Sequence, residues 1–288
     1  MPELPEVETI VRDLSKSLRC KTFSGVIVHD AFLVRQNQKD FIRRIKGQAI
    51  ENITRRGKAV IVHLASGEFL VIQLMMTGQL IANPDARFTR SGSRPPTLLE
   101  RRDGPKDKHT RLTFAFSDGS RLLYNDQRRF GQIRLVESLS QIQYFNILGP
   151  EPFSQEFNPS YMRELFRKTI RPIKNVLLDH TFVAGIGNIY ACEVLFRSQL
   201  SPKRQARRIS LAEVATIHRT IREVLKEAIT HRGSSMRNYR DGAGQKGRFN
   251  ERLMVYSRQG LPCPRCQRPI QRVSQSGRGT FYCAQCQK

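Results

Sequence analysis

The apolar positions of the chain follow a helical spacing at its start, a strand spacing through most of its first half, and a helical spacing again in its second half. The first helical stretch covers 5–18 and reads PEVETIVRDLSKSL. Its apolar residues recur three or four positions apart, which predicts an amphipathic helix; they are Val7, Ile10, Val11, Leu14 and Leu18. Pro5 suits the first turn of this helix, and Glu6 and Glu8 suit its positively charged N-terminal end.

Short runs in which apolar and polar residues alternate follow this helix and end near residue 136. Such alternation is typical of antiparallel strands with one buried face, and turn-forming sequences such as SDGS separate the runs. The predicted strands cover 24–30, 58–64, 68–74, 111–117, 121–125 and 131–136. Together they predict a β-sandwich of about 135 residues behind the leading helix. The polar segment 83–109, rich in proline, glycine and charge, is predicted to be a long loop or insertion between strands.

The second half of the chain has the spacing of helices. Helices are predicted within 158–166, 171–179, 187–198 and 210–230, and a glycine-rich basic loop within 231–250. The fold class is therefore α+β, and no internal repeat is evident. We predict an N-terminal β-sandwich domain over 1–137, a linker over 138–155, a helical domain over 156–257 and a small C-terminal domain over 258–288.

The charge balance of the chain indicates a polyanionic partner. Lys and Arg number 49 against 25 Asp and Glu, which gives a net charge of +24 and a pI of about 10.6. Nucleic acid is the commonest partner for such a surface, although a merely soluble cationic surface is the alternative. The sequence has no run of about 18 apolar residues and no signal-peptide pattern, so we expect an intracellular protein that does not enter a membrane.

Four of the six cysteines form a metal-binding pattern at the C-terminus. Cys263, Cys266, Cys283 and Cys286 are spaced C-x2-C-x16-C-x2-C, which is typical of two knuckles that deliver four thiolates to one tetrahedral zinc. With four protein ligands the zinc is structural. Two redox pairs are the alternative, which the paired spacing disfavours. From residue 252 onward there are six Arg, one Lys and no acidic residue, so the predicted finger is suited to phosphate contact, with Arg278 at a hairpin tip.

The N-terminal sequence MPELPEVET places Pro2 beside acidic residues in a basic protein. Removal of the initiator Met1 would expose a secondary amine at Pro2, and an α-amino group titrates near pH 8, about two pH units below lysine. Such an amine can attack a sugar C1′ and form an iminium directly, with Glu3 and Glu6 placed to move protons. The alternative is that these acids only complement the helix dipole. A DNA- or RNA-binding zinc protein without chemistry also stays open at this point.

Taken in order, several motifs make the chain resemble the formamidopyrimidine-DNA glycosylase family, whose members combine base excision with strand cleavage. They are MPELPEVET, RRGK (55–58), MMTGQL (75–80), NDQRRFG (125–131), LGPEP (148–152), VAGIGNIYACEVLF (183–196) and the C-terminal TFYCAQCQK. The resemblance implies an N-terminal helix with a β-sandwich, a helical domain with a helix–two-turn–helix, a zinc finger, and duplex DNA bound in a cleft between two domains.

The resemblance also implies an activity and catalytic residues. The protein would remove oxidised purines, namely 8-oxoguanine and formamidopyrimidines, from duplex DNA and then cut the strand by β- and δ-elimination. Pro2 would be the nucleophile, and Glu3 the acid that protonates the sugar ring oxygen. Glu6 would be a supporting carboxylate, and Lys58 would contact the phosphate or the lesion.

Further residues would bind the DNA. Gly185 and Gly187 would let the backbone approach a phosphate, and Asn188 would both cap the following helix and bind that phosphate, the alternative being a plain helix cap. An apolar wedge fills the space of an extruded nucleotide in such enzymes, and Met76, Arg128 and Phe130 match the family's filling residues. The implied DNA-binding residues are Gln73, Met76, Arg128, Phe130, Lys174, Asn188 and Arg278. The loop 233–249 resembles the flexible loop that closes over the damaged purine.

The chain departs from the family pattern at a few positions. Gln73 stands where the family often has His, Met75 replaces a usual Gly, Gln127 a usual Pro, and Cys192 a usual small or acidic residue. These changes leave the catalytic residues untouched but affect the expected lesion preference. The related endonuclease VIII class, which prefers oxidised pyrimidines, and an inactive DNA-binding homologue are the alternatives. We expect a monomer that acts on lesion-containing or abasic double-stranded DNA in a bacterial-type cytoplasm.

Overall fold

The computed structural model describes residues 1–83, 108–236 and 238–288. Most of the loop predicted at 83–109 and one residue of the loop 233–249 therefore lie outside the described residues. The described chain forms two compact units. Unit 1 holds residues 1–2, 6–142 and 234–247, and unit 2 holds residues 3–5, 143–233 and 248–288.

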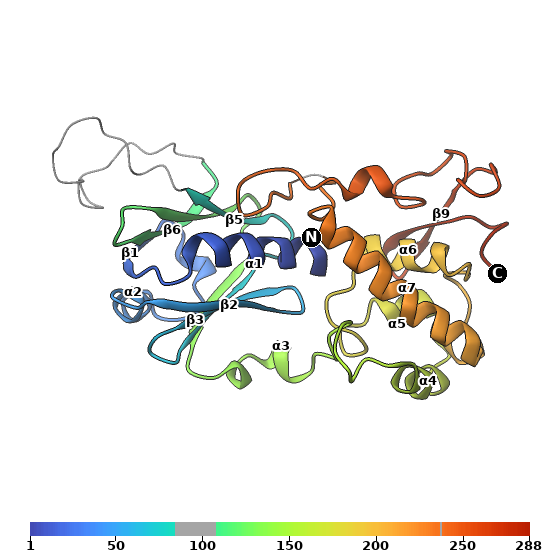
Figure 1. The fold of residues 1–288 in the computed structure, drawn as a ribbon, viewed down its shortest axis with the longest axis horizontal. Helices are drawn as coiled ribbons and strands as arrows, with labels where there is room; N and C mark the ends of the chain where they lie inside the picture. The colour runs from blue at the N-terminus through green and yellow to red at the C-terminus, as the bar shows by residue number, and fades with distance from the viewer. Residues whose placement is uncertain (84–107, 237) are drawn as a thin grey trace. The chain divides into compact units, whose positions relative to one another are not determined.

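Helix α1 (Leu4–Leu18) is the amphipathic helix that the apolar spacing predicts. Its apolar face is completely or almost completely buried in the core of unit 1, which it shares with residues of both sheets. Figure 1 shows this helix in dark blue running alongside the strands of unit 1. The first residue of the helix is an exception, because Leu4 is buried in the core of unit 2.

Two four-stranded antiparallel sheets form the predicted sandwich of unit 1. One sheet has the order β1-β6-β7-β5, made of Phe23–Val28, Thr110–Phe116, Arg121–Asp126 and Gly78–Asn83. The other has the order β2-β3-β4-β8, made of Ile50–Arg56, Ala59–Leu64, Phe69–Gln73 and Gln132–Val136. The central strands β3 and β4 are nearly continuous apolar runs because both of their faces are covered.

Two strands and one α-helix of unit 1 were not predicted. Strand β2 reads IENITRR and is mostly exposed or half-buried, so its pattern lacks the apolar signal of a strand. Strand β5 begins at Gly78 and joins the edge of its sheet through β7. Helix α2 (Gln38–Ile45) buries only Phe41 and Ile45, which is too few apolar positions for a clear helical period.

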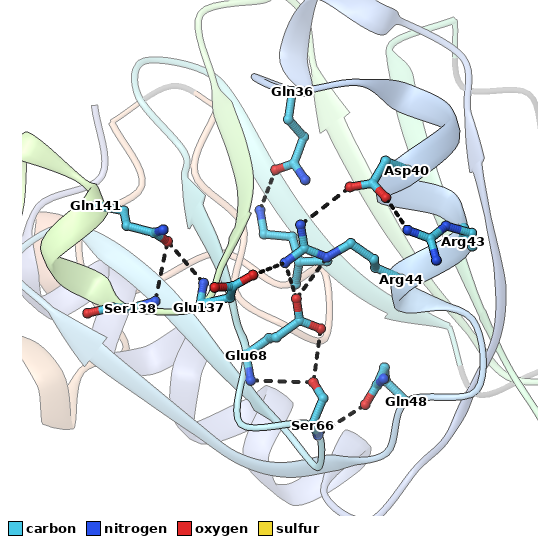
Figure 2. A network of polar contacts seen from close by, with 11 residues as sticks. Gln36, Asp40, Arg43, Arg44, Gln48, Ser66, Glu68, Glu137, Ser138 and Gln141 are labelled. Atoms are coloured by element: carbon cyan, nitrogen blue, oxygen red, sulfur yellow. Dashed lines mark hydrogen bonds and ion pairs between the residues drawn. The ribbon is translucent and has the colours of Figure 1, made fainter.

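A polar network fastens α2 to the turn between β3 and β4 and to the end of β8. The Arg44 guanidinium forms ion pairs with Glu68, with Asp40 and, at 3.6 Å, with Glu137. Figure 2 shows Arg44 at the centre of these contacts, and Ser66 donates to Glu68 beside it. Partly exposed ion pairs are individually weak, so such a network mainly fixes the positions of the three segments.

Unit 2 is mainly helical, with a two-stranded hairpin near its C-terminus. Its helices are α3 (Gln143–Asn146), α4 (Pro159–Arg167), α5 (Ile173–Leu177), α6 (Asn188–Arg197) and α7 (Leu211–Thr230). Helix α7 begins with a capping box between Ser210 and Glu213. Helix α6 is buried on nearly all sides, from Ile189 to Phe196. Short 3-10 helices of unit 2 cover Ala206–Arg208 and Phe249–Arg252. Those of unit 1 cover Ala31–Leu33 and Leu139–Gln141.

The C-terminal hairpin pairs β9 (Gln271–Gln275) with β10 (Arg278–Tyr282), and Arg278 is exposed at its tip as predicted. Ser276 and Gly277 both have positive φ values, which is typical of the tight turns that connect such strands. The buried Glu193 carboxylate of α6 accepts hydrogen bonds from the backbone N–H groups of 254–256 at 2.9–3.0 Å, so it fixes the segment that leads to the hairpin. Among the described residues, no helix is both long and apolar enough to cross a membrane.

Candidate active site

The Glu3 carboxylate is held at the start of α6 in unit 2. Its Oε1 atom accepts a hydrogen bond of 3.0 Å from the backbone N–H of Ile189, and the side chain is buried. The first backbone N–H groups of a helix have no partner within the helix, so an oxygen of the Glu3 side chain can accept from one of them. The backbone N–H of Leu4 also donates to the carbonyl of Gly185 at 3.0 Å. The side chain of Glu3 and the backbone of the following Leu4 are therefore both fixed to the segment 185–189.

Glycine is required in the turn that holds Glu3. A Cβ atom on Gly187 would lie 2.3 Å from Cδ of Glu3, and one on Gly185 would lie 2.7 Å from Cβ of Leu4. Gly185 also has a φ of +84°, which other residues rarely adopt. The sequence pattern suggested that these glycines make room for a phosphate, whereas in the structure they make room for the start of the chain.

Asn188 does not cap α6, so that prediction was wrong. Gly187 is the N-cap residue, and Asn188 is the first residue of the helix. The Asn188 side chain turns to other partners: its Oδ1 accepts from Nζ of Lys174 at 2.6 Å, and its Nδ2 donates to the carbonyl of Gly279 at 2.9 Å. These bonds connect the start of α6 with the hairpin, close to Arg278 in the sequence.

Lys174 was predicted as a direct DNA contact, but the structure buries it completely. Its ammonium donates to Oδ1 of Asn188 and, at 2.7 Å, to Oγ1 of Thr280. Burial is the main cause that lowers the pKa of Lys174; Cys192 opposes it, Arg278 adds a smaller lowering effect, and Glu3 opposes it least. Lys174 thus connects α5 with Asn188 of α6 and Thr280 of β10, so its burial favours a role in positioning Asn188 over direct contact with DNA.

Glu6 and Asp13 of α1 fasten the described part of the predicted closing loop within unit 1. Oε1 of the buried Glu6 accepts from the backbone N–H of Ser234 at 2.7 Å, and Oδ2 of Asp13 accepts from the N–H of Gly242 at 3.1 Å. Sequence reasoning missed Asp13, because an acid on a helix surface carries no signal of its partner. The contact of Glu6 gives it a structural task besides any role in proton transfer.

Lys58 is buried at the turn between β2 and β3. The carbonyl of the preceding Gly57 accepts from Nη1 of Arg55 at 3.0 Å, and Nε of Arg55 donates to Oε2 of Glu8 at 3.0 Å. Burial alone raises the pKa of Glu8, but hydrogen bonds from Arg12 and Arg55 outweigh it, and the pKa lies below its ordinary value. The turn that carries Lys58 is therefore tied to α1 by a charged pair.

Gln73 lies on the strand next to this turn, because it pairs with Ala59 across β3 and β4. Lys58 is the neighbour of Ala59 in the chain. The structure thus brings the predicted contacts Lys58 and Gln73 to the same end of one sheet. Gln73 is half-buried, and its carboxamide can both donate and accept hydrogen bonds.

The three predicted wedge residues lie on two exposed turns of unit 1. Met76 and Phe130 are large apolar residues with 43% and 47% of their surface exposed. The guanidinium carbon of Arg128 lies 4.6 Å from the ring centroid of Phe130, which is cation–π geometry. Exposed apolar side chains backed by a cation are suited to stacking against nucleobases.

The buried Asp126 carboxylate connects these two turns. It accepts from the hydroxyl of Thr77, from the N–H of Arg128 at 3.2 Å and from the N–H of Gly131 at 2.8 Å. The Thr77 hydroxyl in turn accepts from the N–H of Arg128 at 3.0 Å. Sequence reasoning missed Asp126, although an acid at the end of an apolar strand before RRFG is a usable signal. The Asp126 carboxylate thus holds the turn that carries Met76 and the turn that carries Arg128 and Phe130 in fixed positions.

The four C-terminal cysteines form one cluster whose Sγ atoms all lie within 4.8 Å of one another. Two of the Sγ···Sγ distances are 3.9 Å, between Cys263 and Cys286, and 3.5 Å, between Cys266 and Cys283. A tetrahedron with Zn–S bonds of about 2.3 Å has edges of about 3.8 Å, so the cluster fits one zinc ion. The four thiolates hold one structural zinc and leave no open coordination position.

We expect Cys283→Ser to remove the bound zinc and to weaken binding of lesion-containing duplex by about tenfold or more. Loss of the metal would release the hairpin that carries Arg278 and Thr280, and with it the contacts of Asn188. Metal content by atomic emission and DNA affinity by fluorescence anisotropy are the measurements. Cys20→Ser, at an exposed cysteine outside the cluster, is the matched control and should change neither quantity. Unchanged DNA affinity in a zinc-free Cys283→Ser protein would contradict this expectation.

Comparison with known proteins gives matches along the whole chain. The family model described as the formamidopyrimidine-DNA glycosylase N-terminal domain matches residues 1–133, the corresponding H2TH domain matches 148–240, and a zinc finger found in FPG and IleRS matches 260–288. A curated relative, the formamidopyrimidine-DNA glycosylase of Roseobacter denitrificans, is 39% identical over 299 residues, with both chains covered completely.

Solved structures give the same result. The complex of Lactococcus lactis Fpg with abasic-site DNA is similar with a TM-score of 0.87, 33% identity and 99% of each chain covered. The complex of Lactococcus lactis Fpg (MutM) with Fapy-dG DNA is similar with a TM-score of 0.86, 32% identity, and 99% of this chain and all of that chain covered. The similarity includes both units and the zinc finger.

Proposed function

The chain belongs to the formamidopyrimidine-DNA glycosylase family, and we propose that it removes oxidised purines from duplex DNA and then cleaves the strand at the abasic site. The observation that carries the proposal is the buried Glu3 carboxyl, whose Oε1 is fixed by the N–H of Ile189 and which directly follows Pro2 in the chain. Relatives solved with Fapy-dG and abasic-site DNA support the substrate class.

Pro2 is proposed as the nucleophile after removal of Met1. Its secondary amine attacks C1′ of the damaged nucleotide, the bond from C1′ to the base breaks, and the base leaves with a proton. Glu3 as a carboxylic acid donates a proton to the ring oxygen, which opens the sugar and gives an iminium between Pro2 and C1′. Its fixed Oε1 orients the carboxyl plane for this transfer.

Strand cleavage follows from the iminium. Loss of a proton from C2′ lets the 3′ phosphate leave, a second elimination releases the 5′ phosphate, and water then frees Pro2 from the remaining sugar fragment. The iminium acts as the electron sink for both eliminations, so no metal or redox cofactor takes part in these steps. Glu6 is proposed to support Glu3 by holding the segment that begins at Ser234.

Phosphate binding is proposed separately for each unit. In unit 1, Lys58 and Gln73 at one end of a sheet would bind phosphates of the damaged strand. In unit 2, Asn188 and Arg278 would do so, and Lys174 would position Asn188. Charge-assisted contacts of this kind supply much of the affinity for DNA and depend on the salt concentration.

Met76, Arg128 and Phe130 are proposed to fill the space that the extruded nucleotide leaves in the duplex. Both turns are preorganised by Asp126 and Thr77, so little order has to be gained when they enter the duplex. The loop 233–249 is proposed to close over the extruded base. We also propose that the protein is a monomer and works on DNA in the cytoplasm.

The substrate proposal predicts faster excision of 8-oxoguanine opposite cytosine than of thymine glycol, by at least about tenfold under single-turnover conditions. Both lesions would be placed at the same position of one duplex sequence, and released base and nicked strand would be quantified separately. A preference for thymine glycol would support the oxidised-pyrimidine class of endonuclease VIII instead. Tight binding of both duplexes without excision would support a DNA-binding protein without chemistry.

A further inference from the structure

The two turns that carry the wedge residues begin at the same end of one strand pair. Strands β5 and β7 are antiparallel neighbours, and Gly78 of β5 pairs with Asp126 of β7. The turn that carries Met76 directly precedes Gly78, and the turn that carries Arg128 and Phe130 directly follows Asp126. We call the paired strand ends, residues 78–79 and 125–127, the wedge junction. Both wedge turns are therefore continuous with this junction.

Closely packed residues make the wedge junction stiff. Tyr124 of β7 is completely buried, and its hydroxyl contacts Oδ2 of Asp126 at 3.5 Å. A Cβ atom on Gly78 would lie 2.7 Å from the Tyr124 hydroxyl oxygen, and one on Gly131 would lie still closer. Because a close-packed interior transmits strain rather than absorbing it, a shift of either wedge turn is passed on to the junction residues.

Two glutamines of the wedge junction hold one residue of the loop 233–249. Nε2 of Gln79 donates to the backbone carbonyl of Asn238, and Oε1 of Gln127 accepts from Nδ2 of Asn238 at 3.4 Å. Gln79 is the second residue of β5, and Gln127 is the first residue after β7. Asn238 thus contacts both strand ends at once. A proline, which the family usually has at position 127, could not make the second contact, so this link is a feature of the present chain.

Other contacts hold a different part of the same loop. Gly242 donates to Asp13 of α1 at 3.1 Å, and its carbonyl accepts from the N–H of Ala82 at 3.0 Å. The buried Asp241 carboxylate accepts from two backbone N–H groups of the following turn at 2.8 and 3.1 Å. We call residues 241–245 the loop anchor. The described part of the loop is therefore fixed at this anchor and, separately, contacts the wedge junction through Asn238.

We propose that Gln79 and Gln127 are positioning residues that couple the wedge to the loop 233–249 through Asn238. The inference rests on the proposed function, in which the wedge enters the duplex and the loop covers the extruded base. Contact with the duplex fixes the wedge turns, the turns fix the junction, and the two side-chain amides fix Asn238. Placement of the loop over the base is then favoured by the same contacts that hold the wedge in the duplex, which is a coupling between two parts of one site.

Gln79→Ala is expected to slow the release of 8-oxoguanine at saturating protein by about tenfold or more, since a misplacement of about 1 Å can cost about 10² in rate. DNA affinity and borohydride trapping on abasic DNA should stay within about twofold, because an abasic site has no base for the loop to cover. Gln143→Ala, at an exposed glutamine of α3, is the matched control and should leave all three quantities unchanged.

The second contact is tested by removing each of its ends. Gln127→Ala and Asn238→Ala delete the two partners of one hydrogen bond. Each should slow base release by about three- to tenfold, the usual net effect of such a bond. The variant that combines both changes should be no slower than either one alone, because the second change finds no bond left to remove.

Double-mutant cycles separate coupling from simple attachment of the loop. Phe130→Ala removes a wedge side chain. Combined with Gln79→Ala, it should slow base release at least about threefold less than the product of the two single effects, because each change already breaks the path between wedge and loop. Phe130→Ala combined with Asp13→Ala is the control cycle. Asp13 holds the loop anchor and not the junction, so these two losses should multiply. Thermal melts would confirm that each variant is folded.

Three results would overturn the inference. The first is that Gln79→Ala releases 8-oxoguanine as fast as Gln143→Ala. The second is an equal loss in trapping on abasic DNA, which would show general damage to the site. The third is that the losses of Phe130→Ala and Gln79→Ala multiply, which would leave Gln79 as an attachment point without coupling.

Borohydride trapping of the unchanged protein on an 8-oxoguanine duplex separates these outcomes from failure of the proposed function. If the unchanged protein forms no covalent complex, the catalytic proposal is wrong. If it forms the complex while Gln79→Ala releases the base at the normal rate, only the positioning role is wrong.

Discussion

Pro2→Gly is expected to lower the rate of 8-oxoguanine release by about 100-fold or more and to weaken borohydride trapping. Glycine still ends in an α-amine, but it loses the ring that makes the nitrogen a secondary amine and holds its direction, so both nucleophilicity and alignment decrease. Single-turnover base release and the yield of covalent complex after borohydride are the two measurements.

A second replacement at this position separates the amine from the shape of the residue. Pro2→Glu prevents removal of Met1, because the initiator is usually cleaved only before small residues. The reactive nitrogen then becomes an amide, and trapping should be abolished. Lys16→Ala removes a different amine from the exposed side of α1 and should trap like the unchanged protein. Normal trapping by Pro2→Glu would show that another amine forms the Schiff base.

Glu3→Gln is expected to reduce excision of 8-oxoguanine by about 10²- to 10⁴-fold, the usual contribution of a positioned acid or base. The glutamine oxygen can still accept from the N–H of Ile189, so the fold of the turn should survive while the transferable proton is lost. Trapping on DNA that already contains an abasic site should be far less affected, because no base has to leave. The experiment compares excision on lesion DNA with trapping on abasic DNA.

Gly187→Ala tests the position of this carboxyl without changing its chemistry. The added Cβ would come within 2.3 Å of Cδ of Glu3, so the carboxyl has to move. A displacement of about 1 Å can cost about 10² in rate, and the loss should again be larger for excision than for trapping on abasic DNA. Glu164→Gln, at an exposed acid of α4, is the control and should leave both activities unchanged. Full excision by Glu3→Gln would contradict the role of Glu3 as the acid.

Much of the secondary structure was predictable because burial imposes a clear period on the sequence. Helices α1 and α7 each bury one continuous apolar face, and the central strands β3 and β4 are nearly continuous apolar runs. Strand β2 and helix α2 were missed because their stability comes from the neighbouring strands and from the Arg44 network, which leave little trace in the local pattern. The zinc site was predictable since the four ligands come from two compact motifs.

The candidate site was predictable only in part. The motif resemblance identified Glu3, Asn188 and the glycine turn, but it could not show that Gly187 makes room for Glu3 or that Asn188 binds Lys174 and the hairpin. The resemblance implied that Lys174 binds DNA, yet its partners Asn188 and Thr280 come from other segments of the chain, and its side chain is buried. Asp126 was missed because its role depends on contacts with Thr77 on another turn.

Covalent trapping with mass mapping tests the central claim most directly. The full-length protein would be reduced with borohydride on an 8-oxoguanine duplex, digested, and the peptide that carries the sugar remnant sequenced by tandem mass spectrometry. The account predicts a single adduct on the nitrogen of Pro2, in protein from which Met1 has been removed. An adduct on Lys58 or on any other lysine, or full strand cleavage by protein that retains Met1, would contradict it.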